Sequence, residues 1–140
     1  MQKRFYVDTA IRRDYFEDRK DSIRPLGEFA FQFLKCCGAE GCLVLYSEFV
    51  VYELRKDYSE EEINLVFSSF MDFLVEVPIS PAQHSEAGRL AGQRTGSHKT
   101  DILHAILARD NKAVLVTRDA HFDCLRDIVE IIAPEEITFG

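Results

Sequence analysis

The chain has 140 residues, with 24 acidic side chains against 17 Lys and Arg, so its formal net charge is −7. Hydrophobic residues make up 46% of it, which excludes a disordered chain and is enough for the core of one domain. The acidic balance argues against a protein that holds nucleic acid by overall positive charge, although it does not exclude a local basic surface.

The first half of the chain alternates short apolar runs with helical patterns. Strands are expected over 4–7 and 42–46, and helices over 9–19 and 26–37, the second stopped at Gly38. Ser47 is expected to cap a helix that runs to about Lys56. Ser59 and Glu62 form a capping box, which predicts a further helix running to about Leu74.

The second half repeats the alternation. Strands are predicted over 75–77 and 113–116, with an edge strand over 137–139. Helices are predicted from Pro81 to near Gly96, from Lys99 to Asp110, and over 120–127. Strands that alternate with helices indicate an α/β protein with a parallel sheet, and we expect one domain spanning 1–140. No apolar run reaches the roughly 18–20 residues of a membrane span, so we expect a cytoplasmic protein with no membrane partner.

Two aspartates stand where strands are expected to end. Asp8 follows the first strand directly, and Asp119 comes shortly after the strand over 113–116. In open parallel sheets, ligand sites lie beyond the carboxyl ends of the strands, where both residues would be placed. The structural alternative for each is a turn or helix cap, for which Asp is well suited.

Two further acids lie on predicted helices. Glu53 falls within the apolar stripe of its helix, beside Phe49, Val50 and Leu54, and a carboxylate there is costly unless it is paired or binds a metal. Asp101 stands in the first turn of its helix, where favourable interaction with the helix dipole is an alternative explanation.

These four acids would repel one another if they met at one edge of the sheet, unless a cation neutralised them. An all-oxygen ligand set favours Mg²⁺ or Mn²⁺. Such an ion activates water and stabilises the charge of an in-line phosphoryl displacement.

Four segments around these acids resemble the motifs of PIN-domain ribonucleases, including the VapC-type toxin subunits of type II toxin–antitoxin pairs. The segments are 6–9, 47–54, 99–105 and 115–122, in the order and spacing of that family and across nearly the whole chain. Each motif is weak alone, and the four in register are more specific. Ala10 departs from the family, in which many members carry Ser or another small polar residue at that position.

The resemblance implies a Rossmann-like, three-layer fold with about five parallel strands in the order 3-2-1-4-5, flanked by helices. It implies a divalent-metal-dependent endoribonuclease whose products carry a 5′-phosphate, commonly a homodimer and held in check by an antitoxin. The family's catalytic and metal-binding acids correspond to Asp8, Glu53, Asp101 and Asp119. The supporting hydroxyls correspond to Thr9 and Thr117.

Positive charge gathers in two parts of the sequence. Residues 1–24 hold seven Lys/Arg against five acids, and residues 84–120 hold six against four, whereas residues 40–76 hold two against nine. Because phosphate contacts need only local cations, we expect four RNA-backbone contacts near the acids. These are Arg12, Arg13, Lys99 and Arg118.

Several alternatives stay open at this point. The chain is also compatible with an RNA-processing nuclease outside a toxin system, or with a catalytically silent module that binds RNA or protein. A haloacid-dehalogenase-like phosphatase is disfavoured, because that family places a second Asp where this chain has Ala10. The Phe-rich segments over 29–33 and 67–73 are either core or a surface for a homodimer or antitoxin.

Overall fold

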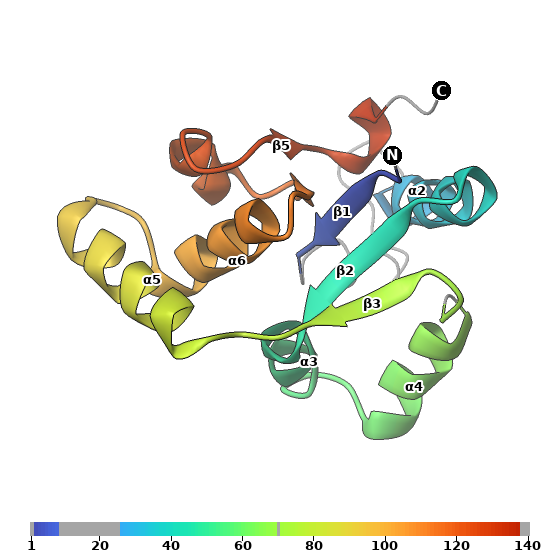
Figure 1. Ribbon diagram of the computed structural model, residues 1–140. Coiled ribbons are helices and arrows are strands. Elements are labelled where there is room, and N and C mark those ends of the chain that lie inside the picture. The colour runs from blue at the N-terminus through green and yellow to red at the C-terminus, as the bar shows by residue number, and fades with distance from the viewer. Residues whose placement is uncertain (1, 9–25, 70, 138–140) are drawn as a thin grey trace.

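A five-stranded parallel sheet forms the centre of the protein (Figure 1). The computed structural model describes residues 2–8, 26–69 and 71–137. The strands are β1 (Arg4–Val7), β2 (Leu43–Ser47), β3 (Leu74–Val77), β4 (Val114–Val116) and β5 (Ile131–Ile132). Their order is β3-β2-β1-β4-β5, and every neighbouring pair is parallel, which confirms the expected α/β class and strand order.

The described helices connect these strands. They are α2 (Leu26–Glu40), α3 (Glu48–Leu54), α4 (Glu60–Ser69), α5 (Pro81–Gln93) and α6 (Lys99–Asp110), with the 3-10 helices η1 (Ala120–Leu125) and η2 (Pro134–Glu136). The helix expected over 9–19 lies outside the described residues. Figure 1 shows α3 beginning where the arrowhead of β2 ends, so this helix starts at the carboxyl edge of the sheet.

The two faces of the sheet carry separate apolar clusters, because successive side chains of a strand point to opposite faces. Phe5 and Val44 pack with Phe33 and Leu34 of α2 on one face. Tyr6 and its neighbours pack with α3, α4 and α6 on the other face. The result is the three-layer arrangement expected for a sheet covered by helices on both sides.

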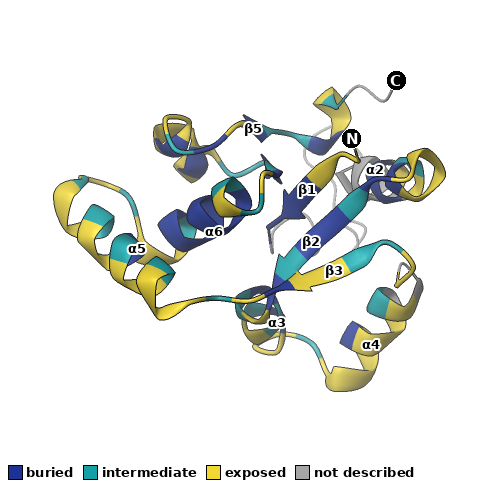
Figure 2. Ribbon diagram, viewed as in Figure 1, coloured by how far each residue is buried: buried dark blue, intermediate teal, exposed yellow. Residues whose placement is uncertain are grey.

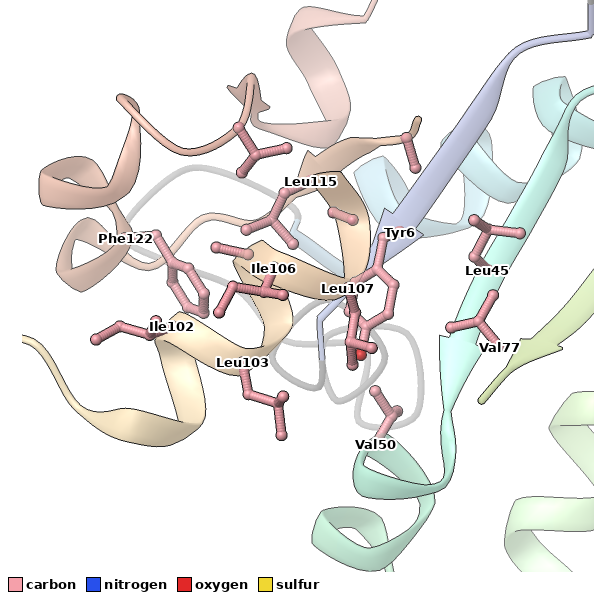
Figure 3. Packing of buried hydrophobic residues seen from close by; sticks show 14 of the residues in the cluster. Tyr6, Leu45, Val50, Val77, Ile102, Leu103, Ile106, Leu107, Leu115 and Phe122 are labelled. Carbon is pink, nitrogen blue, oxygen red and sulfur yellow. The ribbon is translucent and has the colours of Figure 1, made fainter. Parts of the chain in front are cut away.

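Helix α6 is the most deeply buried helix described (Figure 2). Every residue from Ile102 to Ala108 is buried, and in Figure 3 Ile102 lies beside Phe122 and Leu107 beside Tyr6. His104 is the one polar side chain in that buried run. Its place in an otherwise apolar stretch becomes important at the functional site.

Several predicted boundaries were wrong or inexact. The helix predicted to run to about Leu74 is α4, which ends at Ser69, and Leu74 begins β3. Helix α2 continues through Gly38 to Glu40, and the missing Cβ at Gly38 leaves room for the Phe73 ring. The chain turns at Gly41, whose φ is +71°. The fifth strand is β5, which begins six residues before the predicted edge strand at 137–139. Ile137 is not in a strand, and residues 138 and 139 lie outside the described part. A two-residue strand offers too little alternation to be recognised in a sequence.

Candidate functional site

Asp8 is buried at the carboxyl end of β1. Its backbone N–H donates to the carbonyl of Val116 at 3.2 Å, which extends the pairing of β1 with β4 by one residue. Its side chain is held by Thr117, whose Oγ1 donates to Asp8 Oδ2 at 2.7 Å. Only 4% of Asp8 is exposed, so this bond contributes to keeping a carboxylate stable in a buried position.

Asp119 is connected to the same hydroxyl. The backbone N–H of Asp119 donates to Thr117 Oγ1 at 3.1 Å, so one threonine side chain joins the ends of β1 and β4. Asp119 Oδ1 also accepts from the backbone N–H of His121 at 2.9 Å and thereby caps η1. The cap that was the structural alternative for this residue is therefore present, and the side chain remains 39% exposed beside the His121 ring.

Asp101 lies in the first turn of α6, and the pKa of its carboxyl group is raised. Burial raises the pKa of its carboxyl group, and the negative charge of Asp119 raises it further, whereas His104, His98 and His121 oppose the rise. Asp101 and Asp119 are thus close enough for each charge to influence the other. A carboxyl group with a raised pKa next to a second acid, at the end of a parallel sheet, is a candidate for a functional site.

Glu53 projects from α3 and contacts α6. Its Oε1 lies 2.9 Å from His104 Nε2, and the Glu53 side chain is 28% exposed. His104 Nδ1 lies 2.7 Å from the Tyr6 hydroxyl, which in turn lies 2.8 Å from Ser47 Oγ. Glu53 is therefore paired with His104. Ser47 occupies the N-cap position of α3, but its side chain does not cap the helix.

The four acids are joined by two kinds of link. Thr117 connects Asp8 with the backbone of Asp119, and the charges of Asp119 and His104 both act on Asp101. His104 then binds Glu53. The acids therefore lie around the carboxyl ends of β1 and β4 and the adjoining ends of α3 and α6.

The donor chemistry fits a hard divalent cation that keeps much of its water. Within 2–8, 26–69 and 71–137, no three His, Cys, Asp or Glu side chains are grouped closely enough to hold a metal as they stand. Mg²⁺ does not require such a cage, because it commonly uses one or two carboxylates and completes its shell with water and substrate phosphate. The mutually repelling Asp101 and Asp119 carboxylates are the group that a cation would stabilise.

The chain is similar in fold to solved structures over nearly its whole length. VapBC2 from Rickettsia felis, bound to a DNA fragment from its promoter, matches with a TM-score of 0.66 at 17% identity over 93% of this chain and 98% of that one. FitAcB from Neisseria gonorrhoeae matches with a TM-score of 0.61 at 17% identity over 95% and 99%. The chain has a PIN fold. FitAB bound to the IR36 DNA fragment gives a TM-score of 0.62 at 16% identity over 96% and 97%.

Comparisons of the amino-acid sequence alone do not assign the chain to a family. No protein-family model matches the chain, and no curated protein matches it. The helices of the described residues include none that is both long and apolar enough to cross a membrane. At 16–17% identity, what the structures share with this chain is the fold, and its chemistry must be argued from its own residues.

The other residues predicted for the site of this chain fall into three groups. Thr9, Arg12 and Arg13 lie outside the described residues. Lys99 is exposed at the start of α6, beside Asp101. Arg118 is 12% exposed and forms an ion pair with Glu135 at 3.0 Å, which ties the end of β4 to η2, so its contact with RNA stays a prediction.

The Phe-rich segments are core wherever their side chains are described. Phe33 is buried against the Phe5 ring, with 5.5 Å between ring centroids. Phe67 packs edge-on to Tyr46 at 5.0 Å, and Phe73 packs against the α2 cluster. These rings are therefore not the exposed surface that one of the two interpretations required, while the side chains of Phe29, Phe31 and Phe70 lie outside the described part.

Proposed function

We propose that this chain is a divalent-metal-dependent endoribonuclease and the toxin of a type II toxin–antitoxin pair. The observation that carries the proposal is the linkage of Asp8, Asp119, Asp101 and Glu53 around the carboxyl edge of a PIN-type sheet. Structural neighbours from the VapBC and FitAB complexes support the toxin assignment.

Asp8, Asp101, Asp119 and Glu53 would hold Mg²⁺ or Mn²⁺ directly or through its water molecules, together with phosphate oxygens of the RNA. The ion would supply positive charge opposite the scissile phosphate and make water a better nucleophile. Thr117 keeps the Asp8 carboxylate in one orientation, since its hydroxyl donates to Oδ2. Because Asp119 is partly exposed, the site opens to solvent on the side where it lies.

We propose that Lys99 contacts the RNA backbone. It is exposed at the first position of α6, two residues before Asp101, where a positive charge is unfavourable for the helix dipole. A phosphate contact there would offset that unfavourable placement. Substituting Lys99→Gln should therefore flatten the salt dependence of RNA binding by about one unit of slope, and an unchanged slope would reject the contact.

Partners are proposed at exposed apolar side chains of α3, α4 and the turn that follows α4. Tyr52, Leu65 and Met71 are large hydrophobic side chains with more than half of their surface exposed. Apolar side chains of this size are commonly covered in complexes, so an antitoxin or a second copy of the chain would account for their exposure. The neighbouring structures contain such complexes, which favours the antitoxin.

The proposal is tested by RNA cleavage with purified protein. Single-stranded and structured RNA are incubated with Mn²⁺, with and without chelator, beside Asp8→Asn and the control Asp72→Asn, which alters an exposed acid in the turn before β3. We expect cleavage by the parent and Asp72→Asn, and none by Asp8→Asn or in chelator. Cleavage that survives both treatments would reject the metal nuclease, and RNA binding without cleavage would favour the silent module.

A further inference from the structure

A chain of three hydrogen bonds leads from the core of the protein to the candidate site. Ser47 Oγ and the Tyr6 hydroxyl are 2.8 Å apart, the Tyr6 hydroxyl and His104 Nδ1 are 2.7 Å apart, and His104 Nε2 and Glu53 Oε1 are 2.9 Å apart. The four side chains come from β2, β1, α6 and α3. Ser47, Tyr6 and His104 are buried, and of these four side chains only Glu53 is partly exposed to solvent.

The direction of the last bond does not depend on the charge of the imidazole. An ionised carboxylate only accepts hydrogen bonds, so Nε2 must carry a proton to face Glu53 Oε1 at this distance. In the neutral ring, Nδ1 accepts from Tyr6; in the cation, Nδ1 donates to the Tyr6 oxygen. In both forms His104 donates to Glu53.

The surroundings of His104 fix the ring in place. Its side chain is 4% exposed and lies between the Tyr6 ring, at a centroid distance of 5.5 Å, and the Phe49 ring, at 5.6 Å. Figure 3 shows Tyr6 reaching from β1 into the space beside α6, with Val50 of α3 nearby. A rigid donor therefore faces Glu53, whose own side chain has several rotatable bonds.

A purely structural role explains this arrangement less well. The six other residues of the buried run in α6 are apolar, and an apolar residue at position 104 would avoid the burial of a polar ring. The polar chain begins at Ser47 inside the core and ends on an acid at the open edge of the sheet. His104 also lies near enough to Asp101 to influence the ionisation of that carboxyl group.

We propose that His104 is a positioning residue, which holds Glu53 in the orientation needed to share a divalent cation with the aspartates. The inference rests on the proposed function, because it assigns His104 a role in the same site. Partners that orient metal-binding carboxylates commonly change metal affinity or activity by about 10–100-fold when they are removed. Tyr6 helps to hold the His104 ring through its hydrogen bond to Nδ1, and Ser47 acts one hydrogen bond further away, through the Tyr6 hydroxyl.

The test compares His104→Leu with His104→Gln. Leucine fills much of the space of the ring but cannot donate, whereas the glutamine Nε2 group can donate to Glu53 from a similar position. Binding of Mn²⁺ alone is measured from the electron paramagnetic resonance signal of the free ion, and RNA cleavage is measured separately as kcat and KM. His84→Gln, which changes an exposed histidine on α5, is the control.

We expect His104→Leu to bind Mn²⁺ about 10–100-fold more weakly and to lower kcat while KM for RNA changes little. His104→Gln should restore most of the affinity, and His84→Gln should match the parent. A folded His104→Leu with parental Mn²⁺ affinity would overturn the inference. If His104→Leu does not fold, Tyr6→Phe must weaken Mn²⁺ binding, and unchanged affinity in that variant would overturn the inference instead.

The outcomes separate this inference from the proposed function. Parental Mn²⁺ binding without RNA cleavage rejects the nuclease but leaves the effect of His104 on affinity measurable. Mn²⁺-dependent cleavage with no effect of His104→Leu on affinity or kcat supports the nuclease and rejects the positioning role. A parent that binds no Mn²⁺ rejects both.

Discussion

Thr117→Val tests whether one hydroxyl joins the two strand ends at the site. Valine has nearly the shape of threonine, so the change replaces the hydroxyl by a methyl group and opens no large cavity. The buried Asp8 carboxylate then loses a donor at 2.7 Å, and the Asp119 N–H loses its acceptor at 3.1 Å. A bond to a charged group is worth about 2 kcal/mol and the second about 1 kcal/mol at most, so the expected loss is about 2–3 kcal/mol.

Thermal unfolding measures this loss. For a chain of this length, about 3 °C of Tm corresponds to 1 kcal/mol, so Thr117→Val should melt about 6–9 °C below the parent in chelator. Thr117→Ser keeps the hydroxyl and should lose only about 1 kcal/mol through its missing methyl group. In an Asp8→Asn background the effect of Thr117→Val should shrink, because the charged acceptor is gone. A Thr117→Val variant as stable as Thr117→Ser would show that the hydroxyl does not stabilise the two strand ends.

Three further predictions concern stability. Burial and the charge of Asp119 raise the pKa of Asp101 above its ordinary 3.8, so the ionised carboxylate lowers the free energy of unfolding. Asp101→Asn should therefore melt at a higher temperature than the parent at pH 7 in chelator. Below about pH 3.8 the two proteins should melt at the same temperature. The hydrogen bonds from Arg109 lower the pKa of Glu86 below 4.5, so Glu86→Gln should be less stable than the parent at pH 7, with the difference lost as the pH falls below that value. Gly92→Ala, in α5 with no atom within 4 Å of the added methyl group, should raise stability by about 0.5–1 kcal/mol in denaturant titrations, and a lower midpoint would contradict this.

Much of the fold was predictable because its elements carry strong local signals. The helix predicted over Lys99–Asp110 has those bounds in the structure, since apolar residues recur at helical spacing. The capping box at the start of α4 is present, with Ser59 and Glu62 bonded to each other's backbone N–H at 3.0 and 3.2 Å. Both features depend on residues three or four positions apart.

The parts that could not be predicted depend on distant contacts. Gly38 resembled a helix stop, but it accommodates Phe73, which is 35 positions later in the sequence. The short β5 exists because it pairs with Leu115 and Val116 of β4. In both places, packing against a remote segment outweighs the local signal.

The candidate site shows the same division. The position of Asp8 at a strand end and the half-buried position of Glu53 follow from the sequence pattern. The partner of Glu53 does not, because His104 is 51 positions away and occupies what looked like an ordinary place on an apolar helix. The one available signal was a histidine inside a run of buried apolar residues.

The ends of the RNA fragments show whether metal-activated water or the RNA 2′-hydroxyl is the nucleophile. A nuclease whose carboxylates hold a cation that activates water cuts without using the RNA 2′-hydroxyl, so the products should carry 5′-phosphate and 3′-hydroxyl groups. Mass spectrometry of the Mn²⁺-dependent products reads these ends, with Asp119→Asn as the inactive control. We expect 5′-phosphate ends that vanish in chelator and in Asp119→Asn, and 2′,3′-cyclic phosphate ends formed without metal would contradict the proposed metal-dependent cleavage.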